Sequence, residues 1–159
     1  MAHDYTATIA WARGDAAFTD NRYSRAHRWS FDGGVSVPAS SSPWVVRLPL
    51  SREDAVDPEE AFVASLSSCH MLFFLTFAAA KGFVVDSYVD DALGSMGKNE
   101  RGRTYVARVV LRPRIVFSGA KRPSAEDLDA LHHRSHGECF IANSVLTEVV
   151  VEAPAPTFA

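Results

Sequence analysis

DPEEAFVASLSSCHMLFFLTFAAAKG, the stretch from Asp57 to Gly82, predicts one long helix around which the rest of the chain is arranged. Asp57 is a good N-cap residue, Pro58 suits the first helical position, and Glu60 follows the cap by three residues, as a capping box requires. Gly82 follows Lys81 and predicts the end of the helix, because glycine accepts the positive φ found just past a helix. The sequence therefore predicts a helix bounded by Asp57 and Gly82.

This helix is apolar around most of its circumference and, at about 36 Å, is long enough to cross a bilayer. Two features argue against a membrane span: Glu59 and Glu60 lie at one end, and the polar run of residues 65–70 lies in the middle. We therefore expect a central helix that is wrapped by sheet or packed against its copy in a dimer, and no membrane partner.

The chain has 159 residues, which is enough for one domain with a sizeable core, and we predict a single domain over residues 1–159. A formal net charge of −3 gives no reason to expect binding to nucleic acid or to an anionic membrane. The start of the chain lacks the basic and then apolar run of a signal peptide. We therefore expect a cytoplasmic protein.

The rest of the chain consists of predicted strands and one further helix. Alternating apolar residues and turn signals predict strands at residues 5–13, 23–31, 35–38, 44–50, 83–92, 104–117 and 145–151. Pro113, inside the sixth of these, predicts an edge position or a bulge. Ser124 and Asp127 predict the capped start of a second helix that continues toward Cys139. This order of elements predicts an α+β fold with mostly antiparallel sheets.

The predicted strand at residues 23–31 carries charge on its aromatic face. Arg25 and His27 share that face with Tyr23 and Trp29, because alternate residues of a strand point the same way. A guanidinium directed at the apolar side of a sheet needs a partner or a task. The alternative is an edge strand, in which the stem of Arg25 lies along the aromatic rings and its charge reaches water.

The two cysteines of the chain, Cys69 and Cys139, are a candidate redox pair if they meet in space. The alternative is that each is a small buried hydrophobic residue. A cysteine attacks as its thiolate, which a nearby cation stabilises, and Arg25 is our first candidate for that cation. Glu59 precedes Cys69 by ten residues, or about 15 Å along a helix. If both belong to one site, either the helix breaks near residues 65–68 or Glu59 comes from a second copy of the chain.

A zinc site is one competing interpretation. His133, His136 and Cys139 follow one another at intervals of three residues, and Cys69 or His70 is a candidate fourth ligand. The spacing is weaker than that of paired CxxC motifs. We expect His132 and His133, in this polar helix, at the surface.

A Cys-His hydrolase is the other competing interpretation. The candidate bases are His27, His70 and His136. His70 adjoins Cys69, so on a helix its side chain points about 100° away and it is a poor base for that thiol. His27 reaches the thiol only if its strand crosses the helix at the level of Cys69.

Two segments resemble one known family. DPEEAFVASLSSCH, residues 57–70, is similar to the PEE or PEQ segment that is followed ten residues later by cysteine in the OsmC/Ohr family of osmotically inducible and organic hydroperoxide resistance proteins. HGECFIANSV, residues 136–145, resembles the second-cysteine segment of that family. The resemblance extends over nearly the whole chain in the order of the elements.

The resemblance implies an intertwined α+β homodimer with sheets wrapped around long central helices and with two thiol sites at the subunit interface. It implies that Cys69 is the peroxidatic thiol and that Cys139 is the resolving thiol. Glu59 corresponds to the family's glutamate that holds an activating arginine. In a dimer the partner chain brings its Glu59 near Cys69, which agrees with the spacing argument.

The activating arginine is Arg25 if this chain follows the hydroperoxide-resistance branch, in which it lies in the early strand region. In the osmotically inducible branch it lies nearer the PEE segment, where Arg47 or Arg52 would correspond. The sequence departs from the family at Phe140, where proline often follows the second cysteine.

By resemblance, we expect a thiol peroxidase of the oxidative stress response that reduces organic hydroperoxides to alcohols. The sequence has no nucleotide, flavin or haem motif, so we expect no cofactor and an external dithiol reductant, such as a lipoylated protein. Phenylalanines near Cys69 line the core or an apolar pocket. The alternative from another class is a catalytically weak dimer of the same fold that binds an apolar ligand.

Overall fold

The computed structural model describes residues 4–159, and the chain divides into two compact units. The first unit ends at Ala61, and the second runs from Phe62 to Ala159. Over residues 4–159 the fold is α+β, as predicted, with two long helices and three separate three-stranded sheets. The single domain over residues 1–159 stays a prediction.

The first unit contains one antiparallel sheet in the order β1-β2-β3. Its strands are β1 (Ala7–Ala10), β2 (His27–Phe31) and β3 (Ser36–Ala39). Trp29 is paired with Ile9 on one side and with Val37 on the other. The strand predicted at residues 23–31 thus begins only at His27, and Arg25 lies in the loop before it.

The strand predicted at residues 44–50 is wrong, because this segment forms turns. The carbonyl of Ser42 accepts hydrogen bonds from the backbone N–H groups of Val45 and Val46, at 3.0 and 2.9 Å. The Ser42 hydroxyl also accepts one from the Trp44 N–H, at 3.2 Å. A serine that bonds its own backbone in this way competes with strand pairing, and the apolar pattern does not reveal it.

Helix α1 (Pro58–Ala80) begins and ends as its capping residues predict. The Glu60 N–H donates to the Asp57 carboxylate at 2.8 Å, and the Asp57 N–H donates back to the Glu60 carboxylate at 3.3 Å. Past the helix, Gly82 has φ of +78° and the Phe83 N–H bonds to the Ala78 carbonyl. The helix is unbroken, so the break considered near residues 65–68 does not occur.

The second unit contains two mixed sheets. Its strands are β4 (Val84–Asp90), β5 (Leu93–Lys98), β6 (Thr104–Leu111), β7 (Pro113–Ser118), β8 (Glu148–Val151) and β9 (Thr157–Phe158). The sheet orders are β4-β7-β9 and β5-β6-β8, with β4–β7 and β5–β6 antiparallel and β7–β9 and β6–β8 parallel. Strands β5 and β9 were not predicted.

The single strand predicted at residues 104–117 is divided at Arg112 into β6 and β7, which belong to different sheets. The Arg112 N–H donates to the side chain of Asp90 at 2.6 Å instead of to a strand, and the next residue, Pro113, has no N–H to donate. Pro113 is the first residue of β7, which is the central strand of its sheet. The predicted edge position is therefore wrong, although a first strand position is one that proline tolerates.

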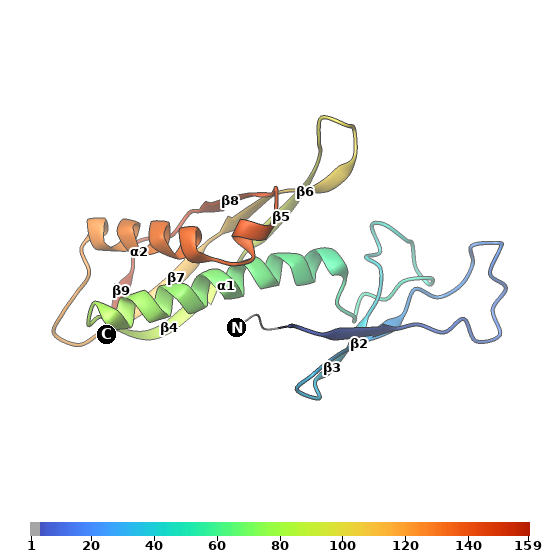
Figure 1. Ribbon diagram of the computed structural model, residues 1–159, viewed down its shortest axis with the longest axis horizontal. Helices are drawn as coiled ribbons and strands as arrows, with labels where there is room; N and C mark the ends of the chain where they lie inside the picture. The colour runs from blue at the N-terminus through green and yellow to red at the C-terminus, as the bar shows by residue number, and fades with distance from the viewer. Residues whose placement is uncertain (1–3) are drawn as a thin grey trace. The chain divides into compact units, whose positions relative to one another are not determined.

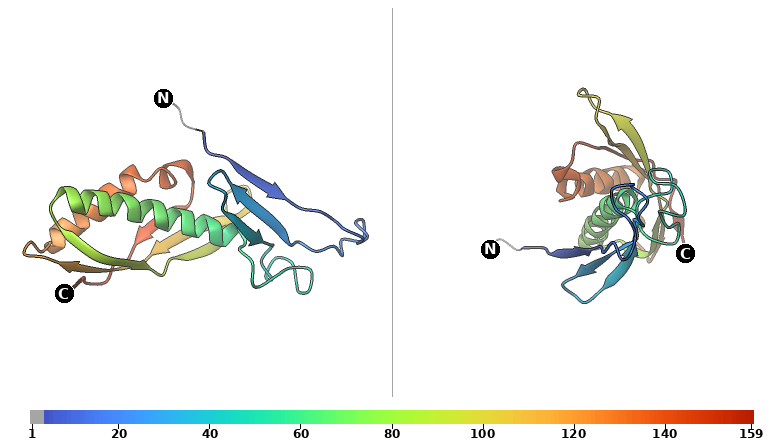
Figure 2. Two further views of the ribbon diagram at one scale, coloured as in Figure 1. Left: turned by 90° about the horizontal axis from the view of Figure 1, so that it is seen from below. Right: turned by 90° about the vertical axis from the view of Figure 1, so that its right-hand side faces the viewer.

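Helix α2 (Ala125–Glu138) starts at the predicted cap, where Ser124 and Asp127 bond to each other's backbone N–H groups. It runs beside α1, and both helices lie on one side of the strands of this unit (Figures 1 and 2). Lys81 at the end of α1 pairs with Asp127 at 3.0 Å. A short 3₁₀ turn, η1 (Ala142–Ser144), leads to β8.

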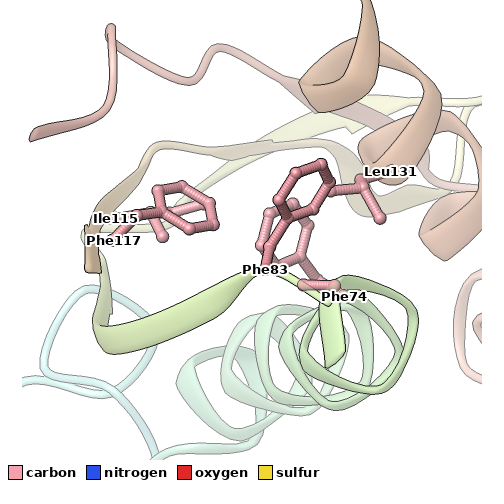
Figure 3. Close-up of a cluster of buried hydrophobic side chains, with 6 residues drawn as sticks. Phe74, Phe83, Ile115, Phe117 and Leu131 are labelled. Carbon is pink, nitrogen blue, oxygen red and sulfur yellow. The ribbon is translucent and has the colours of Figure 1, made fainter. Parts of the chain in front are cut away.

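The core of the second unit forms where α1 and α2 meet the sheets. Four residues of α1 at intervals of four are buried: Leu66, His70, Phe74 and Ala78. Figure 3 shows Phe74 gathered with Phe83, Ile115, Phe117 and Leu131, all 5 % exposed or less. A second cluster surrounds Leu66 and the β6 residues Val109 and Leu111.

Helix α1 is the one helix among residues 4–159 that is long and apolar enough to cross a membrane. Its buried stripe packs against the two sheets and α2, which is the behaviour of a core helix. The other sides of α1 are less covered than the sequence predicts. Leu72, for example, is 59 % exposed.

Candidate functional site

The two thiols meet between α1 and the end of α2. Cys69 lies in the middle of α1 and is partly buried, whereas Cys139 caps the C-terminus of α2 and is 1 % exposed. Cys139 has extended backbone, and the Asn143 side chain donates to the carbonyls of Gly137 and Cys139 at 2.8 and 3.0 Å. These bonds satisfy carbonyls at the helix end and hold Cys139 in place.

Burial and the neighbouring thiol keep Cys139 protonated. Burial first, and then a hydrogen bond with the Cys69 thiol, raise the pKa of Cys139 to about 11. The Ala142 N–H, 3.4 Å from the Cys139 sulfur, opposes this shift only in part. At neutral pH the pair therefore holds a neutral thiol at Cys139 that touches the more exposed Cys69.

A pair of buried histidines joins the two helices that carry the thiols. His70 Nε2 and His132 Nδ1 are 3.1 Å apart, and the two rings stack at 5.4 Å with an angle of 12° between them. The side chains are 1 % and 8 % exposed, respectively. Phe74 packs on His132 with ring centres 4.6 Å apart.

Both histidines are neutral at physiological pH. Burial, followed by the electrostatic repulsion that protonated His132 and His136 would exert, lowers the pKa of His70 to about 4. Burial also lowers the pKa of His132 to about 4, although the carboxylates of Asp129 and Asp90 oppose the shift. One ring therefore donates a hydrogen bond to the other, and neither carries charge into the core.

His132 was expected at the surface, and that prediction is wrong, whereas His133 is exposed as predicted. A signal for the burial of His132 was present in the sequence. Leu128, Leu131, His132 and Ser135 follow the i, i+3, i+4, i+7 spacing of one helical face. Three of the four are buried, and Leu128 is partly buried.

Neither the zinc site nor the hydrolase arrangement gains support. Residues 4–159 contain no group of three or more histidine, cysteine, aspartate or glutamate side chains that could hold a metal. The His70 ring is hydrogen-bonded to His132 rather than to a thiol. His27 is bonded within the first unit, with its Nδ1 2.8 Å from the Arg25 carbonyl and its Nε2 accepting from the Trp29 indole. His136, the third candidate base, is exposed in the last turn of α2.

The candidate activating arginines all belong to the first unit. The Arg25 guanidinium donates to Asn21 at 2.7 Å and lies over the Tyr23 ring, with 3.9 Å to its centre. Arg52 makes a bidentate pair with Asp54 at 2.8 and 2.6 Å. Arg47 is exposed. Which of the three activates Cys69 stays a prediction.

Glu59 lies in the first turn of α1 and is partly buried. Since α1 is continuous, Glu59 and Cys69 of the same chain are separated by about 15 Å along the helix axis. A role for Glu59 beside Cys69 therefore requires a second copy of the chain, and that role also stays a prediction.

Residues 51–153 match the sequence profile of the OsmC-like protein family. The chain is 56 % identical to an OsmC-like protein of unknown function from Vibrio cholerae, with a TM-score of 0.94 over 96 % of this chain and 100 % of that one. No protein of curated function matches it.

Two more distant structures share the fold. An organic hydroperoxide resistance protein from Elizabethkingia anophelis is 14 % identical, with a TM-score of 0.66 over 100 % of this chain and 99 % of that one. The organic hydroperoxide resistance protein OhrB of Bacillus subtilis is 16 % identical, with a TM-score of 0.60 over 96 % and 98 %.

The histidine pair predicts that acid destabilises the fold. Unfolded histidines bind protons near pH 6.5, but His70 and His132 in the folded chain do so only near pH 4. The unfolded state therefore binds more protons between these values, and stability is lost as the pH falls from about 6.5 toward 4. We expect the free energy of unfolding, measured with urea, to fall by an amount on the order of 5 kcal/mol across this window, because two groups titrate.

His132→Gln removes one of the two titrating groups and should make this dependence on pH clearly shallower. The matched control is His133→Gln, at an exposed position of the same helix, which should keep the wild-type dependence. An unchanged slope in His132→Gln would show that the acid sensitivity arises elsewhere.

Proposed function

Because the chain belongs to the OsmC-like protein family, we propose that it is a thiol-dependent peroxidase that reduces organic hydroperoxides to alcohols. The observation that carries the proposal is the contact between a partly exposed Cys69 and a buried, protonated Cys139. The names of the more distant relatives support the same kind of substrate.

In the first step, the Cys69 thiolate attacks the terminal oxygen of the hydroperoxide. A sulfur–oxygen bond forms as the oxygen–oxygen bond breaks, and the alkoxide leaves with a proton as the alcohol. Cys69 is thereby oxidised to a sulfenic acid, and the hydroperoxide is reduced by two electrons.

In the second step, the Cys139 sulfur attacks the sulfenic sulfur of Cys69, and water leaves with the proton that Cys139 carried. The contact between the two side chains supports this resolving role, because the disulfide then forms before further oxidation of Cys69. An external dithiol, such as the lipoyl group of a partner protein, reduces the disulfide by exchange and is itself oxidised.

We further propose that the working unit is a homodimer. The chain itself buries only one stripe of α1, and it leaves Leu72 59 % exposed on an apolar helix. A second copy would cover this surface and would also bring its Glu59 toward the site. A solution mass equal to one 17.4 kDa chain at full activity would contradict this proposal.

We place the protein in the cytoplasm, where thiols are kept reduced and dithiol reductants are available. Both cysteines are free in the structure, which agrees with that setting. Recovery of the activity in a membrane or secreted fraction would contradict this location.

Replacing either cysteine should block the proposed cycle, but at different steps. With cumene hydroperoxide and dihydrolipoamide, Cys69→Ser should consume peroxide no faster than buffer, because the attacking sulfur is gone. Without the dithiol, Cys139→Ser should consume about one equivalent, after which Cys69 is trapped as a sulfenic acid that dimedone labels. The peroxide that remains in quenched samples measures consumption, and mass spectrometry measures the dimedone label. Consumption by Cys69→Ser at the wild-type rate would overturn the proposed function.

Assays of the wild-type protein also distinguish the peroxidase from the alternative function, a weak enzyme that binds an apolar ligand. A wild-type chain that binds an apolar fluorophore but leaves cumene hydroperoxide intact would favour the alternative. The observation that favours this alternative is the exposed apolar side chain of Phe140, the residue after Cys139.

Loss of the activating arginine should make Cys69 less reactive near neutral pH. In a Cys139→Ser background, we expect Arg25→Ala to shift the pH dependence of Cys69 alkylation upward by about one unit, because the thiolate loses its cation. Arg47→Ala and Arg52→Ala test the other two candidates in the same way. Arg101→Ala, in the exposed turn between β5 and β6, is the control, and an unchanged profile in all three test variants would reject the first-unit arginines.

A further inference from the structure

A line of aromatic rings leads away from the two cysteines along α1. Phe140, the residue after Cys139, meets Phe73 edge to face, with ring centres 5.2 Å apart and an angle of 89°. Phe73 in turn lies 5.9 Å from Phe77. Since Cys69, Phe73 and Phe77 are spaced by four residues, they follow one another along the same side of the helix.

Within one chain, this aromatic line is open to an apolar molecule. Phe140 is 67 % exposed, and Phe73 and Phe77 are only partly buried, unlike Phe74 on the core side of the same helix. Exposed aromatic side chains that touch one another give a continuous apolar surface, which favours contact with an acyl chain or a ring.

A cation lies at the Phe77 end of this aromatic line. The Arg134 guanidinium, from α2, lies over the Phe77 ring with 3.9 Å to its centre. Among residues 4–159, the structure gives Arg134 no ion pair with a carboxylate. By contrast, Arg108 and Arg112 pair with Glu152, and Arg114 pairs with Asp91. Arg134 is therefore a guanidinium that is oriented by an aromatic ring and still has donors for an anion.

The rise of α1 between Cys69 and Phe77, the residues at the two ends of the line, sets the approximate length of the ligand. Cys69 and Phe77 are eight residues apart, which corresponds to about 12 Å along α1. We propose that Arg134 is a specificity-determining residue that binds the carboxylate of an anionic, long-chain hydroperoxide whose peroxide group lies about 12 Å away at Cys69.

The acyl chain between the two groups would lie on Phe77, Phe73 and Phe140. A planar carboxylate accepts two parallel hydrogen bonds from guanidinium, so Arg134 would orient the substrate as well as attract it. This inference rests on the proposed peroxidase function, to which it adds the charge and the length of the preferred substrate.

The test compares linoleic acid hydroperoxide with its methyl ester, which has the same chain and peroxide but no charge. Wild-type protein should show a higher kcat/KM for the acid, and added KCl should reduce this preference because the ion pair is partly exposed. In Arg134→Gln the ratio of acid to ester should fall about fivefold. Arg134→Lys, which retains the charge, should retain part of the ratio.

Arg122→Gln is the matched control. Arg122 also lies over an aromatic ring, that of Phe158, with 4.8 Å to its centre, but it precedes α2 and is not on the aromatic line. This variant should keep the wild-type ratio and its salt dependence.

The two hypotheses fail differently. A wild-type protein that consumes neither the acid nor the ester would overturn the proposed peroxidase function. A wild-type protein that consumes both at equal rates would overturn only the role of Arg134, and so would an Arg134→Gln variant with an unchanged ratio.

Discussion

The hydrogen bond between His70 and His132 joins the two helices that carry the cysteines. His70 directly follows Cys69 on α1, and His132 lies two turns before Cys139 on α2. A shift of either helix would separate the two rings and leave polar nitrogens in the core without partners, at a cost of about 1 to 3 kcal/mol. The contact between the thiols therefore depends on the hydrogen bond between His70 and His132, which holds the two helices together.

That bond also requires both imidazoles to be neutral, which burial ensures by lowering their pKa values. The same buried interface acts in the opposite sense on Cys139, because it disfavours the charged thiolate and raises the pKa. In the proposed reaction this asymmetry gives the two sulfurs separate tasks. The partly exposed Cys69 meets the peroxide, and the protonated Cys139 provides the proton that leaves with water.

The parts of the fold that depend on neighbouring residues were predictable. Asp57, Glu60 and Gly82 set the ends of α1, and Ser124 and Asp127 set the start of α2, because capping is decided within a few residues. The strand β5 was missed because Gly94 and Gly97 weaken its pattern. Gly94 is needed there, since a Cβ would lie 2.5 Å from a methyl group of Val63 on α1.

The candidate site was less predictable, because it depends on contacts between distant residues. Asp90 divides β6 from β7 by bonding to Arg112, which is 22 positions away in the chain. His132 has the spacing of a buried helical face, but its polar partner, His70, lies on the other helix and is not indicated by any local pattern. The prediction that Cys69 and Cys139 meet came from the family resemblance, because the two residues are 70 positions apart and no local pattern links them.

Whether Cys69 and Cys139 form one redox pair is tested most directly by mass spectrometry of the reduced wild-type protein after treatment with one equivalent of cumene hydroperoxide. We expect a loss of two hydrogens per chain, a disulfide-linked peptide pair containing Cys69 and Cys139, and one equivalent of cumyl alcohol. Two free thiols with the hydroperoxide left intact would contradict it.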